Sequence, residues 1–149
     1  MRIDGLARSL GKGLIAGVAG TAAMTVSSTI EAKLRGRTFS TAPADAAAKA
    51  LGIAGFESPE AKSRFSNLVH WGYGTGYGLL YGLLRGTGLP SKSVTPAHFA
   101  TVWGSALVML PKFDVAPPIT MWGREEVAID MWHHLVYSVA TGLAYELLD

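Results

Sequence analysis

Four long stretches of the chain contain no charged side chain. They cover residues 13–30, 65–84, 93–110 and 131–145, which are 18, 20, 18 and 15 residues long. A helix on a soluble surface presents a polar face every three or four residues, and these stretches do not. A helix of 18 residues rises about 27 Å, close to the roughly 30 Å thickness of the hydrocarbon core of a bilayer. With their flanks, the stretches predict four membrane-spanning helices, at about 12–31, 65–86, 94–111 and 128–148.

The connections between these helices are short, except for the polar loop 32–64. Short connections favour an up-down bundle. Within the loop, residues 42–51 (APADAAAKAL) are rich in alanine, with Pro43 at the start and Gly52 after the end. This composition is typical of a short helix, which we expect to lie at the membrane interface. We therefore expect an all-α, polytopic membrane protein with a single membrane domain, residues 1–149.

Composition excludes several classes of protein. Charged residues make up 16% of the chain, against about 25% in an ordinary soluble domain. A net charge of +2 without a large basic patch gives no reason to expect a nucleic-acid partner. There is no cysteine, so disulfides, thiolate metal sites and cysteine nucleophiles are excluded. No catalytic sequence motif is found, which argues against an enzyme without excluding one.

Small residues recur every fourth position on two of the predicted helices. In lipid, close approach of helix backbones through small residues supplies much of the packing energy. We expect the two stripes to face each other, and a seam between copies of the chain or a thin polar path are the alternatives. The stripes consist of Gly13, Gly17 and Thr21 on the first helix and of Gly74, Gly78, Gly82 and Gly86 on the second.

The up-down topology brings several ionisable residues to one end of the bundle. Ionisable groups near a membrane are costly unless they are paired, which makes them candidates for function. Two imidazoles with one or two carboxylates can hold zinc or non-haem iron, whereas haem is not expected so close to the interface. The predicted ligands are Glu31, His70, Asp130 and His134.

The same residues also suggest a proton or ion path, because histidine exchanges protons near neutral pH. A stripe of aromatic side chains on the second helix continues from the cluster. Alternatively, the tyrosines fill space opposite the glycines, and the histidines are satisfied by water, headgroups and nearby basic residues. The predicted path residues are His70, Tyr73, Tyr77, Tyr81 and His133.

The sequence resembles the YagU-type family of small bacterial inner-membrane proteins. The resemblance is carried by residues 14–17 (LIAG) with Glu31 downstream, by His70 about twenty residues before Pro90, by the pair 117–118 (PP), and by residues 134–136 (HLV). It spans most of the chain. It implies a polytopic inner-membrane protein of unassigned molecular activity with a loose association with acid tolerance, and it adds weight to His70 and His134.

Three functions are compatible with these features. The first is transport or proton handling through the histidine and carboxylate cluster. The second is a non-catalytic accessory subunit of a larger membrane complex, and the third is a metal-binding membrane protein. The lipid bilayer is the expected partner in each case, and the charge distribution leaves the membrane orientation open.

Overall fold

The computed structural model describes residues 3–38 and 40–149, and over these ranges the protein is all-α, without a strand. Each uncharged stretch lies inside a helix that is several residues longer, so the helical fold class is confirmed. The elements are α1 (Ile3–Leu34), α2 (Ala42–Ala50), α3 (Pro59–Gly86), α4 (Ser91–Lys112), a short 3-10 turn η1 (Ile119–Met121) and α5 (Arg124–Leu148).

Local signals in the sequence set several helix ends. The hydroxyl of Ser58 accepts a hydrogen bond from the amide of Ala61 at 3.1 Å and caps α3, whose first residue is a proline. The Glu126 carboxylate accepts a hydrogen bond from the amide of Gly123 at 2.8 Å, where α5 begins. The chain turns out of α2 at Gly52, which has a φ of +70°. The short helix predicted in the long loop is therefore confirmed, with its end at the predicted glycine.

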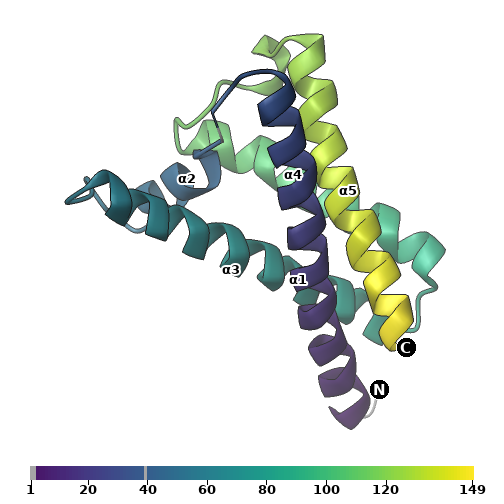
Figure 1. Cartoon of the computed structure of the whole chain (residues 1–149). Coiled ribbons are helices and arrows are strands. Elements are labelled where there is room, and N and C mark those ends of the chain that lie inside the picture. Colours follow the sequence, from purple (N-terminus) through teal and green to yellow (C-terminus); the bar gives the residue numbers. More distant parts are fainter. Residues whose placement is uncertain (1–2, 39) are drawn as a thin grey trace.

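The helices form two pairs, α1 with α5 and α3 with α4, and the two pairs cross (Figure 1). α1 and α5 run side by side in opposite directions, and α3 crosses α1. α4 packs against α5 and α3, while the short α2 packs against α3 and α4. α1 makes most of its contacts with α3 and α5, so the first helix of the chain is also the central one.

The predicted small-residue stripes face each other along the α1–α3 contact. A methyl carbon added at Gly17 would lie 2.8 Å from the carbonyl oxygen of Thr75, and one added at Gly78 would lie 2.7 Å from the Cα of Gly17. Gly13 lies against Gly78 and Gly82 in the same way. At one end of this seam Gly74 meets the side chain of Thr21, at the other Gly82 meets Ser9, and Gly86 is the last residue of α3. The two backbones are therefore in direct contact, as the spacing predicts.

The interior contains polar residues beside its small and aromatic apolar ones, and many large aliphatic side chains are exposed. The fully or almost fully buried polar residues are Ser9, Thr21, His98, His133, Ser138 and Thr141. Large aliphatic side chains are instead exposed along the helices, among them Ile15 at 60%, Val26 at 59% and Leu143 at 63%. The buried polar residues are the more informative of the two features, because exposed aliphatic side chains also occur on soluble proteins.

Only one of the described helices, α1, is both long and apolar enough to count as a candidate membrane span by length and hydropathy. The prediction of four spans is therefore not confirmed by this measure. That prediction relied on the absence of charge, whereas the uncharged stretch of α3 is rich in glycine and tyrosine, which contribute little hydropathy. The structure supports an all-α protein with one helix that meets the criterion.

Candidate functional site

The carboxylate of Glu31 lies at the centre of a charged cluster near the C-terminal end of α1. Gly36, with a φ of +62°, turns the chain back, and the guanidinium of Arg37 donates two hydrogen bonds to Glu31. Arg35 lies 3.6 Å from the same carboxylate and 3.0 Å from that of Glu125 on α5. The side chain of Glu31 is only 15% exposed, and that of Glu125 is 75% exposed. Glu31 is therefore the inner carboxylate of the cluster and Glu125 the outer one.

His133 of α5 reaches Glu31 from inside the protein. Its Nε2 lies 3.6 Å from the Glu31 carboxylate, and its Nδ1 is hydrogen-bonded to the hydroxyl of Ser27 at 3.0 Å. The side chain is 8% exposed, and Nε2 has no hydrogen-bond partner among the described residues. An imidazole and a carboxylate at this separation form a pair that can take up and release a proton.

A second pair of histidine and carboxylate lies on the other face of α5. The Nδ1 of His134 is 2.8 Å from the main-chain oxygen of Asp130 and 3.6 Å from its carboxylate. The indole of Trp103, on α4, donates a hydrogen bond to the same carboxylate at 2.8 Å. This confirms that Asp130 and His134 share a helix face, as their spacing of four residues predicts. Trp103 holds the carboxylate, and the sequence analysis did not select it.

The structure does not assemble the predicted metal site. Among the residues described, no group of three or more histidine, aspartate and glutamate side chains is placed to hold a metal ion. His133 faces Glu31, whereas His134 faces Asp130, because consecutive side chains on a helix point about 100° apart. His70 is hydrogen-bonded through Nε2 to the hydroxyl of Thr25 at 2.8 Å. The described contacts therefore do not bring Glu31, His70, Asp130 and His134 together as one ligand set.

The predicted tyrosine path is divided into separate contacts. The hydroxyl of Tyr73 donates to that of Tyr77 at 3.2 Å, and Tyr77 is hydrogen-bonded to Ser105 of α4 at 2.6 Å. Tyr81 pairs instead with Thr95 of α4 at 3.0 Å. His70 faces α1, away from these partners. With His133, which bonds to Ser27, the residues predicted as one relay form four separate groups, and no described hydrogen bond between their side chains joins these groups.

His98 is a buried ionisable residue that the sequence analysis did not include in the site. It is 0% exposed, and its ring lies 5.3 Å from that of Tyr81 and 5.5 Å from that of Tyr137. Its Nε2 is hydrogen-bonded to the main-chain oxygen of Tyr77 at 3.0 Å. The sequence signal that could have identified His98 was an ionisable side chain within the uncharged stretch 93–110. Its surroundings are aromatic, so His98 packs the contact between α3, α4 and α5.

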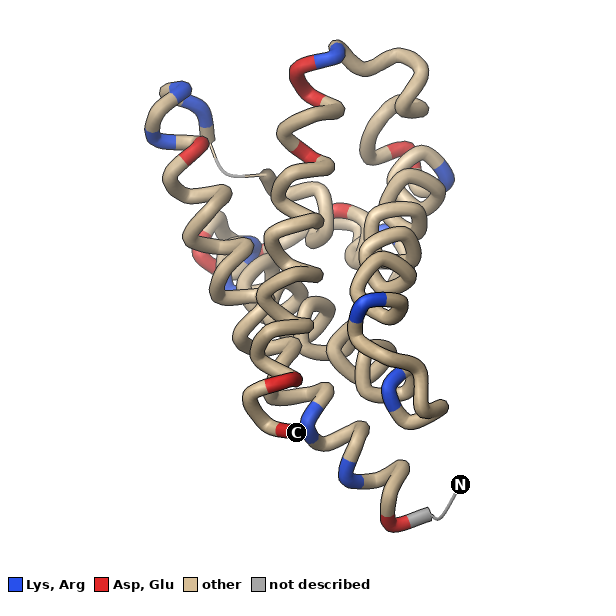
Figure 2. Tube along the Cα trace, turned by 90° about the vertical axis from the view of Figure 1, so that its right-hand side faces the viewer, with Lys and Arg blue, Asp and Glu red and all other residues tan. Residues whose placement is uncertain are grey.

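A second charged cluster ties the helices together at the opposite end of α1 and α5. Lys12 donates to Asp149 at 2.8 Å, and Arg85 of α3 lies 2.7 Å from Asp149 and 3.1 Å from Glu146. Arg85 also lies over the ring of Tyr145, 5.4 Å from its centre. Figure 2 shows the charged residues of α1 and α5 towards the two ends of these helices, with uncharged stretches between them.

No protein-family model matches the chain, and neither the curated proteins nor the solved structures include a significant match.

Proposed function

We propose that the chain is a multi-pass helical protein of the bacterial inner membrane that handles protons through the pair formed by His133 and Glu31. The exposed aliphatic side chains and the buried, hydrogen-bonded polar residues support the membrane location. Trp132, which precedes His133 on α5, is 57% exposed, as expected of an aromatic residue at a membrane interface. The resemblance to the YagU-type family is part of this proposal.

The distance between the two charged clusters also supports this location. Lys12 and Glu31 are 19 residues apart on α1, a helical rise of about 28 Å. This separation is close to the hydrocarbon thickness of a bilayer, roughly 30 Å. Each cluster would therefore lie near one membrane surface, with the uncharged stretches between them.

The observation that carries the proton-handling function is the position of His133. Its buried imidazole lies between the Glu31 carboxylate at the end of the bundle and the hydroxyl of Ser27 further inside. Histidine is the side chain whose ordinary pKa lies nearest to neutral pH. Arg35 and Arg37 keep the Glu31 carboxylate ionised, and its negative charge can stabilise a proton that His133 takes up from the aqueous side.

The test compares two carboxylates of the same cluster. Glu31→Gln and Glu125→Gln each remove one carboxylate that contacts Arg35, but only Glu31 contacts His133. In proteoliposomes with a pH-sensitive dye inside, we expect Glu31→Gln and His133→Gln to abolish the proton flux of the wild-type protein. Glu125→Gln is expected to leave the flux unchanged.

Equal flux in all variants, with wild-type amounts of folded protein, would exclude the proposal. A wild-type protein without any flux, recovered from native membranes in a stable complex with another protein, would favour the accessory-subunit alternative. That alternative has support in the close contact of α1 and α3, whose seam leaves no room for a water path between these helices.

A further inference from the structure

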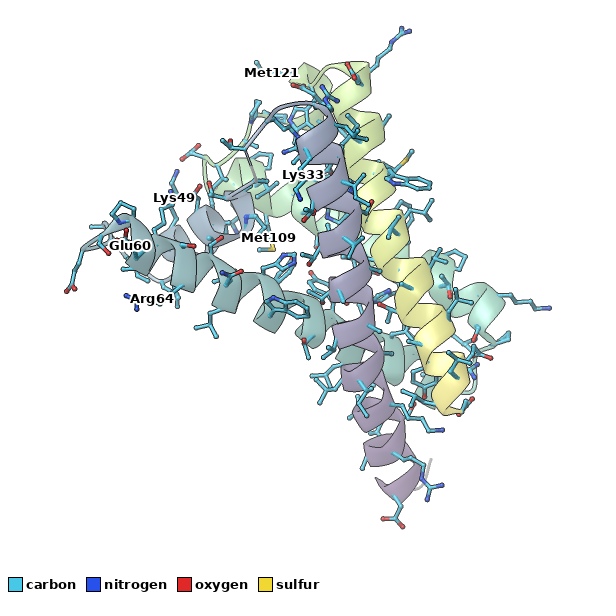
Figure 3. The ribbon with its side chains drawn as sticks, viewed as in Figure 1. Lys33, Lys49, Glu60, Arg64, Met109 and Met121 are labelled. Carbon is cyan, nitrogen blue, oxygen red and sulfur yellow. The ribbon has the colours of Figure 1, made fainter. Side chains whose placement is uncertain are left out.

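A pocket of about 440 Å³ lies where α2, the first turns of α3 and the segment after α4 meet. It is separate from the pair formed by His133 and Glu31. Its charged lining residues are Asp45, Lys49, Lys62 and Asp114, and its larger apolar ones are Ile53, Phe56 and Val115. Figure 3 shows Lys49 on α2 near the end of α3 that is marked by Glu60.

The backbone that surrounds the pocket is fixed by two helix ends. Beyond α2, the amide of Ile53 donates to the carbonyl oxygen of Ala48 at 2.9 Å. Beyond α4, the amide of Val115 donates to the carbonyl oxygen of Leu110 at 2.9 Å, and Asp114 adopts a φ of +51°. Each helix thus ends in a tight turn that places an apolar residue directly in the pocket wall.

Both signs of charge are present around the pocket. The ammonium of Lys49 donates to the main-chain oxygen of Asp114 at 2.9 Å and forms no ion pair with any acidic residue that the structure describes. Since an ammonium has three donors, two of them stay available to a ligand. Lys62 lies 3.0 Å from the carboxylate of Asp45, whose other oxygen accepts a hydrogen bond from the hydroxyl of Thr41 at 2.7 Å.

The combination of charges selects the ligand. A ligand with only negative charge would meet the carboxylates of Asp45 and Asp114, and the C-terminal ends of α2 and α4 add partial negative charge. A ligand with only positive charge would meet Lys49 and Lys62. A zwitterion avoids both conflicts, because its anionic group can contact Lys49 while its cationic group contacts the carboxylate of Asp114. Lys62 and Asp45 already pair with each other.

We propose that this pocket binds the headgroup of a phospholipid that carries a phosphate and a primary ammonium, of the phosphatidylethanolamine class. The primary ammonium can donate hydrogen bonds to Asp114, which a quaternary ammonium cannot. The apolar wall of Ile53, Phe56 and Val115 accommodates the glycerol and the upper part of the acyl chains. The inference rests on the membrane location in the proposed function, but it is independent of proton handling.

The test uses the whole protein reconstituted in vesicles with equal parts of phosphatidylethanolamine, phosphatidylglycerol and phosphatidylcholine. The protein is extracted in a mild detergent, and the retained lipids are identified by native mass spectrometry. We expect phosphatidylethanolamine to be retained preferentially. Lys49→Gln is expected to lower its retention about tenfold, which corresponds to one lost charge-assisted hydrogen bond. Lys92→Gln is the matched control, because Lys92 is exposed near the start of α4, at its opposite end.

Asp114→Asn tests the recognition of the ammonium group separately from that of the phosphate. It removes the carboxylate that is not paired with Lys62, so phosphatidylglycerol is expected to gain on phosphatidylethanolamine in this variant. Equal retention of the three lipids by the wild-type protein, or equal losses in Lys49→Gln and Lys92→Gln, would overturn the inference. Competition by inorganic phosphate without a preference among the lipids would also overturn it, because the site would then bind a free anion.

The outcomes also distinguish this inference from the proposed function. Selective retention of phosphatidylethanolamine by a protein without proton flux would support the lipid site and contradict proton handling. Proton flux that depends on Glu31, without lipid selectivity, would do the reverse.

Discussion

Every second residue from position 72 to position 78 of α3 is a glycine, but these glycines have different surroundings. A methyl carbon at Gly78 would lie 2.7 Å from the Cα of Gly17, whereas one at Gly76 would have nothing within 4 Å. The difference follows from helix geometry, since Gly78 faces α1 and Gly76 does not. The requirement for glycine therefore comes from the neighbouring backbone at one of these positions only.

Gly78→Ala is expected to lower the free energy of unfolding by about 1–3 kcal/mol, because the backbone atoms of α1 cannot move aside as a flexible side chain could. Gly76→Ala is the matched control. It is expected to be neutral or to stabilise by up to about 1 kcal/mol through helix propensity. Equilibrium unfolding in detergent micelles measures both variants, and equal effects would mean that the α1–α3 seam is wrongly assigned.

The α1–α3 seam and the cluster around Glu31 show which side-chain contacts can be predicted from a sequence. A spacing of four residues fixes a helix face, so Gly13, Gly17 and Gly78 could be assigned to one contact from the sequence alone. The partner of Glu31 depends on the rotation of α5, which no local pattern reports, and His133 occupies the place predicted for His134. The return of Arg37 to Glu31 depends on the positive φ of Gly36, a local signal that the sequence analysis did not use.

Arg85 links α3 to α5 at the end of the protein opposite to Glu31. It contacts the carboxylates of Glu146 and Asp149 and the ring of Tyr145, and its side chain is only 16% exposed. Arg85→Gln is expected to lower the free energy of unfolding by about 1.5–3 kcal/mol, the range for hydrogen bonds to charged groups. The exposed Lys92→Gln serves as the control for loss of one positive charge. A melting temperature of Arg85→Gln equal to that of this control would exclude the linking role.

The attachment of α2 to α3 is expected to depend on pH. The Thr41 hydroxyl and the Lys62 ammonium hold the pKa of Asp45 below its ordinary value. Because the pKa is lower in the folded state, the ion pair stabilises the protein fully above the ordinary pKa of aspartate, about 3.9. This stabilisation is lost as the pH falls through the lower, folded-state pKa.

Hydrogen exchange of the α2 amides, corrected for intrinsic rates, measures this effect. Protection is expected to decrease at acidic pH in the wild-type protein and to be already lower, and less dependent on pH, in Asp45→Asn. Since both side chains are about one-third or more exposed, the effect should stay below about 1 kcal/mol. A pH profile of Asp45→Asn identical to that of the wild type would show that another group titrates.

The proposed membrane location predicts a simple labelling pattern, and the absence of cysteine from the chain makes it easy to measure. Val139 is 42% exposed near the middle of α5, and Lys92 is exposed near the start of α4. In vesicles, a small hydrophilic maleimide is expected to label Lys92→Cys once the bilayer is permeabilised. It should leave Val139→Cys unlabelled until the protein is denatured. Fast labelling of Val139→Cys in intact vesicles would contradict a multi-pass arrangement.

The helical segments could be predicted well from the sequence. Hydropathy, however, supports only one of the four predicted membrane spans among the described helices. Each uncharged stretch predicted the interior of one helix, because charged residues are concentrated near the helix ends and in the connections. The crossing of the two helix pairs could not be predicted, since it follows from the seam at Gly17 and Gly78 and from the charged clusters at both ends. The pocket beside α2 depends on this crossing as well, which explains why no sequence pattern indicated it.

The central position of α1 has a consequence for the order of biosynthesis. This helix is translated first, yet one of its two main partners, α5, is translated last. Until α5 arrives, the face of α1 that carries Ser27 and Glu31 lacks His133. In the proposed membrane location, a chain released before residue 124 would expose these groups to lipid. The last helix is therefore needed to cover the first.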